Sequence, residues 1–125
     1  MTTHTTPTAP HLRTGAKGEV LAARYLERQG LIVLSKNWRC PEGELDLVAT
    51  DRHNLIICEV KTRTSTNYGH PAEAVTFEKG LRIRRLARRW RADHHVRWCP
   101  ERFDIIAITW PRNEPPKLQH FKAAF

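Results

Sequence analysis

Residues 43–63 read GELDLVATDRHNLIICEVKTR, two apolar segments joined by a short polar connection. Both segments are rich in Leu, Ile and Val and are bounded by turn residues, so we expect strands at 45–49 and 55–61. The polar connection at 51–54 is short enough to join them as an antiparallel hairpin. The chain therefore carries several acidic and basic residues on two adjacent strands.

The register of this hairpin decides which charged side chains face each other. If the connection is symmetric, residues whose numbers sum to 105 lie opposite each other. Asp46 is then opposite Glu59, and Glu44 is opposite Lys61. Two directly opposed carboxylates repel unless they share a proton or a divalent cation. The alternative is that Glu59 and Lys61 form an ordinary ion pair on a solvent-exposed strand face.

Hydrophobic periodicity predicts the remaining elements. In chain order, we expect a flexible leader at 1–14, a helix at 15–29, a strand at 31–34, a loop at 37–43, a helix within 72–94 and a strand at 102–110. Residues 117–125 form either an edge strand or a tail. The order α-β-β-β-α-β predicts a single α/β domain over 15–125, with helices packed on a mixed sheet.

The first predicted helix carries an acidic residue beside its apolar face. Ala16, Val20, Ala23 and Leu26 share one face, and Glu19 lies on or next to it. An unpaired carboxylate on a buried face costs several kcal/mol. Glu19 therefore either points over the sheet toward the strand acids or acts as a first-turn acid that stabilises the helix N-terminus.

The composition points to a negatively charged partner. The chain has 125 residues, and its 21 Lys and Arg against 13 Asp and Glu give a net charge of +8. Such an excess is typical of proteins that bind nucleic acid or another polyanion. No apolar run approaches the roughly 20 residues of a membrane span, so we expect no membrane partner. Three widely spaced cysteines without a CxxC pattern indicate the reducing cytoplasm rather than a disulfide framework.

The second predicted helix is amphipathic and rich in arginine. Its apolar residues are spaced for one buried stripe, at Ile83, Leu86, Ala87 and Trp90. The basic residues along one flank are Lys79, Arg82, Arg85 and Arg89. A helix anchored by its stripe can present such side chains to a phosphate backbone, and Arg39 and Arg63 extend the basic surface. The alternative is an ordinary solvated charged face.

Several of these segments together resemble the YraN family of small bacterial proteins. The shared pattern comprises Gly15, Gly18 and Glu19 in the first helix, NWRC at 37–40, GELDLV at 43–48, EVKTR at 59–63 and RFDIIA at 102–107. The resemblance spans about residues 13–110. That family is placed in the PD-(D/E)XK restriction-endonuclease-like superfamily and is similar to archaeal Holliday junction resolvases. The resemblance therefore implies a restriction-endonuclease-like α/β fold.

By position in these motifs, the resemblance implies that Glu19, Asp46, Glu59 and Lys61 are catalytic residues. Glu19 matches the helix glutamate of the resolvase-like branch, and Leu45 stands where the superfamily usually has proline. Carboxylate oxygens are the ligands that Mg²⁺ or Mn²⁺ prefers, so Asp46, Glu59 and Glu19 are the expected metal ligands. Lys61 is expected near the attacking water or the scissile phosphate.

The sequence thus predicts a metal-dependent nuclease that cleaves phosphodiester bonds in DNA or RNA, with branched or structured nucleic acids among the candidate substrates. The alternative is a basic nucleic-acid-binding protein that keeps the fold without cleaving. The opposed carboxylates favour the enzyme, because a binding module does not need them. The oligomeric state is left open, with a homodimer as one option.

Overall fold

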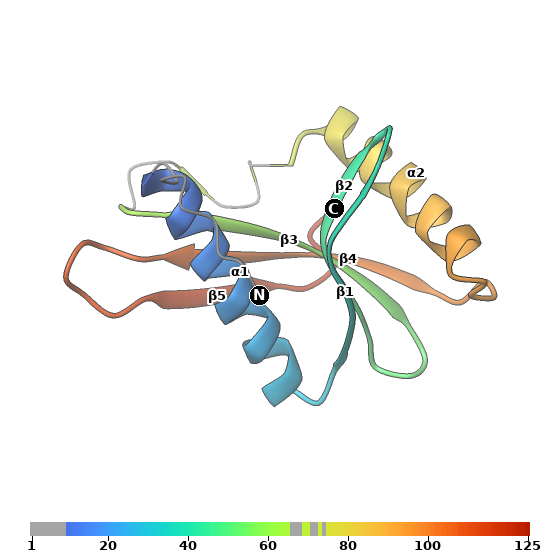
Figure 1. Ribbon diagram of the computed structural model, residues 1–125, viewed down its shortest axis with the longest axis horizontal. Helices are drawn as coiled ribbons and strands as arrows, with labels where there is room; N and C mark the ends of the chain where they lie inside the picture. Colours follow the sequence, from blue (N-terminus) through green and yellow to red (C-terminus); the bar gives the residue numbers. More distant parts are fainter. Residues whose placement is uncertain (1–9, 66–68, 71–72, 74) are drawn as a thin grey trace, which may run out of the picture.

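The computed structural model describes residues 10–65, 69–70, 73 and 75–125 (Figure 1). Along these residues the elements are α1 (Pro10–Arg28), β1 (Ile32–Cys40), β2 (Gly43–Thr50), β3 (Leu55–Arg63), α2 (Phe77–Asp93), β4 (Glu101–Thr109) and β5 (Lys117–Phe121). The described strands form one five-stranded sheet in the order β1-β2-β3-β4-β5. β3 and β4 are parallel, and the other neighbours are antiparallel. The predicted α/β fold with a mixed sheet is confirmed.

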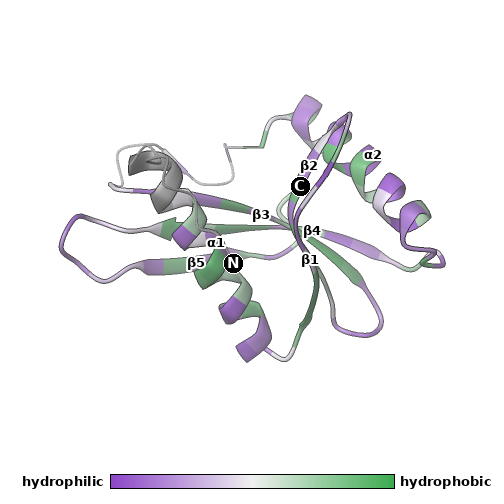
Figure 2. Cartoon of the chain, viewed as in Figure 1, coloured by the Kyte–Doolittle hydropathy of each residue, from purple (hydrophilic) through white to green (hydrophobic). Residues whose placement is uncertain are grey.

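The sheet is covered by one helix on each face. Ile57 and Cys58 are consecutive on β3 and belong to separate cores on opposite faces, as the pleat of a strand requires. The predicted stripe of α2 is buried on the Ile57 side, and Ala22, Ala23 and Leu26 of α1 are buried on the Cys58 side. Figure 2 shows hydrophilic and hydrophobic residues alternating along α2, as expected for an amphipathic helix. Neither helix, within the described residues, is long and apolar enough to cross a membrane.

Two segments differ from their predicted structure, and a third decides between two predicted alternatives. α1 begins at Pro10, inside the segment expected to be a flexible leader, and residues 1–9 lie outside the described residues. The expected loop at 37–43 is wrong, because β1 continues to Cys40 and pairs with β2 along the way. β5 pairs with β4, so the C-terminal segment contributes an edge strand rather than only a tail.

The face of α1 that packs on the sheet is rotated from the predicted one. Ala16 and Val20, which the spacing predicts to face the core, are exposed, whereas Gly18 is buried. An added Cβ at Gly18 would overlap the hydroxyl of Thr62 on β3. The glycine therefore permits a close approach of α1 to β3, which brings the neighbouring Glu19 near residues of β2 and β3.

β2 follows β3 for only part of its length. The pairs from Thr50–Leu55 to Leu47–Cys58 have the predicted register, in which residue numbers sum to 105. The β2–β3 ladder of the described residues ends there, before the predicted pairs Asp46–Glu59 and Glu44–Lys61, while the earlier part of β2 remains paired with β1. The β1–β2 hairpin turns away from the rest of the sheet and approaches α2 (Figure 1). A pocket opens where the two strands part, and Asp46 is among the residues that line it.

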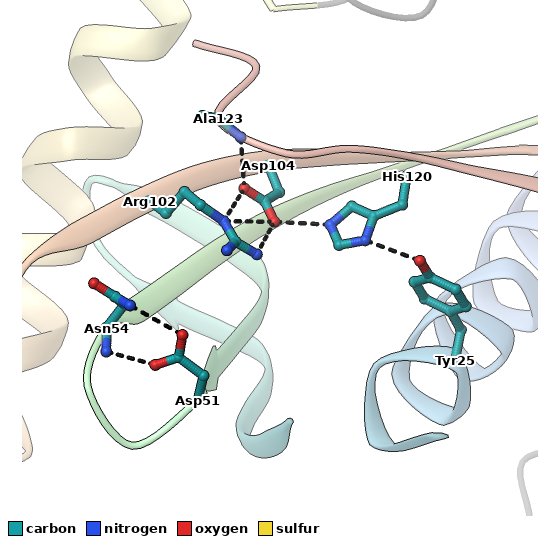
Figure 3. Close-up of polar contacts among 7 residues, drawn as sticks. All are labelled: Tyr25, Asp51, Asn54, Arg102, Asp104, His120 and Ala123. Atoms are coloured by element: carbon teal, nitrogen blue, oxygen red, sulfur yellow. Dashed lines mark hydrogen bonds and ion pairs between the residues drawn. The ribbon is translucent and has the colours of Figure 1, made fainter. Parts of the chain in front are cut away.

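A buried polar network joins the edge of the sheet to α1 (Figure 3). Asp104 on β4 is fully buried and lies 2.7 Å from Nε2 of His120 on β5 and 2.8 Å from Nη2 of Arg102. The Ala123 N–H donates to the same carboxylate, and Tyr25 of α1 lies 3.0 Å from Nδ1 of His120. Burial alone would raise the pKa of Asp104, but these hydrogen bonds outweigh it and lower the pKa. The network fixes the position of β5 against β4 and α1.

Candidate functional site

A pocket opens where β2 and β3 part. Its volume is about 380 Å³, and α1, the β1–β2 hairpin, β3 and α2 all contribute to its wall. The charged side chains that line it are Glu19, Glu42, Glu44, Asp46, Glu59, Lys61, Lys79 and Arg82, beside the apolar Ile83 and Leu86. The four residues that the sequence predicts to be catalytic are thus brought together from α1, β2 and β3.

Asp46 lies at the point where the two strands separate. Its Oδ2 accepts a hydrogen bond from the backbone N–H of Val60 at 2.9 Å. Burial raises the pKa of Asp46 to about 7, and the nearby Glu59 contributes in the same direction, while the hydrogen bond from Val60 opposes both. A divalent cation beside this carboxyl group would favour its ionised form.

Glu59 is buried and already has a cationic partner. Only 6% of the residue is exposed, and its Oε1 lies 3.1 Å from Nζ of Lys79 on α2. Lys79, which the helix pattern places among the nucleic-acid-binding residues, lines the pocket. Lys79 is four residues before Ile83 and so continues the buried stripe of α2. This spacing is the signal that places it in the site.

Lys61 and Glu19 complete the pocket from β3 and α1. Partial burial and the nearby Lys79 lower the pKa of Lys61, while Glu59 acts to raise it. Partial burial also raises the pKa of Glu19, and a hydrogen bond with the side chain of Asn37 offsets part of this effect. Glu59 disfavours the ionisation of both Glu19 and Asp46, and a cation among these acids would relieve that repulsion.

The chemistry of the pocket fits a hard divalent cation. Its lining offers the carboxylate oxygens that Mg²⁺ and Mn²⁺ prefer, rather than imidazole or thiolate groups. Within the part of the chain that the structure describes, no three Asp, Glu, His or Cys side chains are placed to hold a metal ion as they stand. Because the Lys79 ammonium is already paired with the Glu59 carboxylate, a metal ion can bind to Glu59 only if these side chains rearrange.

An arginine-rich surface of α2 adjoins this pocket. Arg82, Arg85 and Arg89 line a second hollow of about 390 Å³. Arg89 is partly neutralised, because its Nη1 lies 3.1 Å from Glu42 and its Nε lies 3.3 Å from Asp93. Arg82 and Arg85 are exposed and form no ion pair with any described residue. Of the three arginines that line this hollow, these two are therefore more available to an anionic partner than Arg89.

The two other predicted nucleic-acid contacts lie on strands. Arg39 on β1 is exposed, and its Nε lies 3.0 Å from Oε2 of Glu44, one of the acids that line the pocket. Arg63 ends β3 and is half-buried, and its carbonyl accepts a hydrogen bond from the Trp110 N–H at 2.7 Å. The basic surface beside the pocket therefore consists mainly of α2 residues.

The sequence matches one known protein family over most of its length. The family profile described as "Uncharacterised protein family UPF0102" covers residues 18–108. The chain belongs to the UPF0102 family. This membership confirms the resemblance to the YraN proteins, and the UPF0102 region contains the pocket acids Glu19, Asp46 and Glu59 together with Lys61.

UPF0102 proteins of several bacteria resemble this chain over most of its length. That of Frankia casuarinae is 49% identical over 111 residues, which are 89% of this chain and 94% of the relative. That of Beutenbergia cavernae is 49% identical over 108 residues, or 86% of this chain and 92% of the relative. A UPF0102 protein of Rhodococcus jostii is 46% identical over 117 residues, or 94% of this chain and 99% of the relative. These relatives therefore share nearly the whole described domain.

Proposed function

We propose that the protein is a metal-dependent nuclease that hydrolyses phosphodiester bonds in DNA or RNA. The observation that carries the proposal is the convergence of Asp46, Glu59, Lys61 and Glu19 in one pocket beside the exposed arginines of α2. Glu59 is buried and Asp46 and Glu19 are half-buried, and gathering such acids in one place is costly, so a fold that does so without a functional reason is uncommon. A divalent cation would account for the acidic side chains of the site, and a phosphate would account for the basic ones.

Each pocket residue has a role that follows from its position. Asp46 and Glu59 would hold Mg²⁺ or Mn²⁺, and Glu19 would approach it from α1. The bound cation would supply a water of lowered pKa and neutralise negative charge on the phosphate. Lys61 places a compact positive charge beside Glu59, where it can contact the scissile phosphate. Arg82 and Arg85 would bind the backbone outside the pocket.

The arrangement of the elements supports a restriction-endonuclease-like fold. The order from α1 to β4 is the expected α-β-β-β-α-β, and the motif acids lie on the antiparallel strands β2 and β3. Lys61 follows Glu59 on the same strand with the expected spacing. We further propose that the protein acts in the cytoplasm, because its three cysteines are free thiols, the form that a reducing compartment maintains.

A second candidate function is nucleic-acid binding without cleavage. The observation that favours it is the ion pair between Lys79 and Glu59, which neutralises one motif acid without any metal. In this case the pocket would have no catalytic role and would be stabilised by its internal ion pair, and the arginines of α2 would bind the nucleic acid. The two candidates differ in one respect that can be measured directly, namely hydrolysis that depends on a divalent cation.

The deciding experiment is a cleavage assay with Mg²⁺ or Mn²⁺ on duplex, single-stranded and branched DNA and on RNA. We expect cleavage by the parent and a loss of cleavage in Asp46→Asn. Glu27→Gln is the matched control, because Glu27 is an exposed acid of α1 outside the pocket lining. Cleavage that persists in Asp46→Asn would show that this pocket is not its source, and an inactive parent that still binds nucleic acid would favour binding without cleavage.

A further inference from the structure

The pocket contains two lysines around one buried carboxylate. Lys61 lies on β3, two residues after Glu59, and Lys79 reaches the same carboxylate from the first turn of α2. The side chain of Glu59 is 7% exposed and that of Lys79 is 27% exposed. The Lys79–Glu59 contact thus lies at the boundary between the core and the mouth of the pocket.

This contact has a physical reason when the pocket holds no metal. A buried carboxylate that lacks a positive partner is strongly destabilising. Glu59 cannot leave its place, because it lies within the β3 ladder and its strand neighbours belong to the core. Lys79, by contrast, is a flexible four-carbon side chain near the end of a helix, and it is the more exposed partner of the pair.

A cation and the Lys79 ammonium compete for the same oxygen atoms. A divalent ion that coordinated Glu59 while Lys79 remained 3.1 Å from Oε1 would place two positive charges in contact. The ammonium must therefore move outward, toward the pocket mouth that Arg82 also lines. There it would join the exposed basic residues of α2, where a phosphate of the substrate would meet it.

We propose that Lys79 is the resident counter-ion of Glu59, displaced by the divalent cation when it binds, and that this displacement limits the cation affinity of the free protein. The proposal rests on the proposed function, since it concerns the metal that the pocket would hold. It gives the two lysines separate roles. Lys61 stays beside the reacting phosphate, whereas Lys79 is a positioning residue that changes partner between the metal-free and metal-bound states.

The test is the affinity for Mn²⁺ alone, measured by calorimetry without nucleic acid. Lys79→Met keeps the aliphatic stem but removes the charge, so we expect it to bind Mn²⁺ at least about tenfold more tightly than the parent, equivalent to about 1.4 kcal/mol. Lys79→Arg keeps the charge and should bind no more tightly than the parent. Arg82→Met is the matched control, because it removes one positive charge from the same helix and pocket without touching Glu59.

Thermal melting checks that the variants fold and gives an independent readout. Without metal, Lys79→Met should melt below the parent because Glu59 loses its partner, and saturating Mn²⁺ should raise its melting temperature more than it raises that of the parent. Equal Mn²⁺ affinities of Lys79→Met and the parent, or an equal gain in Arg82→Met, would overturn the counter-ion role while the metal site remained. If neither the parent nor Lys79→Met binds Mn²⁺, the proposed metal site itself is wrong, and the role of Lys79 is overturned with it.

Discussion

The Asp46 carboxylate accepts a hydrogen bond from the Val60 backbone N–H at 2.9 Å, at the point where the β2–β3 ladder ends. The side chain thus occupies the place that a carbonyl of the neighbouring strand would otherwise take. One carboxylate oxygen satisfies the backbone of β3, while the other is left for the pocket. The proposed metal ligand therefore also shapes the opening in which the metal would lie.

Replacing Asp46 with asparagine should weaken cation binding while the fold is retained. The amide oxygen can still accept a hydrogen bond from Val60, but the negative charge is lost. The Mn²⁺ affinity should therefore fall by more than the roughly 10–100-fold that is typical when a residue hydrogen-bonded to a metal ligand is replaced. Calorimetric titration measures this loss. Glu44→Gln is the control, since Glu44 lines the same pocket but pairs with Arg39. Similar losses in both variants would show a general charge effect rather than coordination by Asp46.

The raised pKa of Asp46 predicts a specific pH dependence of stability. Its pKa is about 7 in the folded chain, against about 3.9 for an unfolded aspartate. Between these values the folded state binds more protons, so this group lowers the free energy of unfolding as the pH rises from about 4 to about 7. Asp46→Asn should therefore gain stability relative to the parent over this interval, as measured by urea unfolding at several pH values. A difference between the two proteins that stays constant with pH would contradict the assignment.

The exposed arginines of α2 should determine the salt dependence of nucleic-acid binding. Replacing both Arg82 and Arg85 by alanine should make the slope of log affinity against log salt concentration on duplex DNA shallower by about 1.8, or about 0.9 for each lost phosphate contact. Arg89→Ala should have a smaller effect, because Glu42 and Asp93 already neutralise that side chain.

The control for this prediction is the double variant Arg24→Ala, Arg28→Ala, which removes the same charge from exposed positions of α1. Binding is measured by fluorescence anisotropy over a series of salt concentrations. If the control flattens the slope as much as the α2 variant does, net charge rather than the α2 surface governs binding.

Gly18→Ala should destabilise the protein and disturb the site. The added methyl group would meet the Thr62 hydroxyl, and a misfit of this size costs about 1–3 kcal/mol in a packed core. Gly15→Ala provides the control within the same helix, since an added Cβ there meets nothing within 4 Å and alanine favours a helix by up to about 1 kcal/mol. The free energy of unfolding, measured with a denaturant, should therefore fall in Gly18→Ala and rise in Gly15→Ala. A stabilised Gly18→Ala would show that α1 does not approach β3 so closely.

The network around Asp104 should contribute to stability as a coupled unit. His120→Ala removes a partner from a fully buried carboxylate, and we expect it to cost about 1–3 kcal/mol in the free energy of unfolding. Tyr25→Phe removes only the hydroxyl group next to His120. A double-mutant cycle of these two changes should show non-additivity, whereas Gln119→Ala, at an exposed position of the same strand, should change little. Strict additivity would separate Tyr25 from the network.

The hairpin register could be predicted from the sequence, because a period of two and a short connection leave few alternatives. The pairs from Thr50–Leu55 to Leu47–Cys58 follow the predicted register. The course of β1 could not be predicted in the same way. Its segment contains Asn37, whose φ of 50° is a turn-like conformation inside a paired strand, and Pro41 follows directly after the strand ends. Residues that normally indicate a loop here mark an irregular hairpin.

The composition of the pocket was only partly accessible from the sequence. The four motif positions could be placed by strand alternation and family resemblance, because these are local or familiar patterns. The entry of Glu42 depends on how the β1–β2 hairpin docks beside α2, which no local pattern specifies, whereas the spacing of Lys79 from Ile83 is a signal in the sequence. The Asp104 partners His120 and Ala123 were equally hidden, since their contacts require the pairing of β5, and the sequence left that segment as either an edge strand or a tail.

The position of the Asp104 partners in the sequence has a consequence for folding during synthesis on the ribosome. The buried carboxylate of Asp104 contacts His120 and accepts a hydrogen bond from the Ala123 N–H, and these two residues follow Asp104 by 16 and 19 positions. During synthesis, β4 emerges first and carries a charge that cannot be buried until those later residues are also free to fold. The sheet is therefore expected to close late, after translation has passed residue 123, and a nascent chain stalled before that point would expose the region as a target for chaperones and proteases.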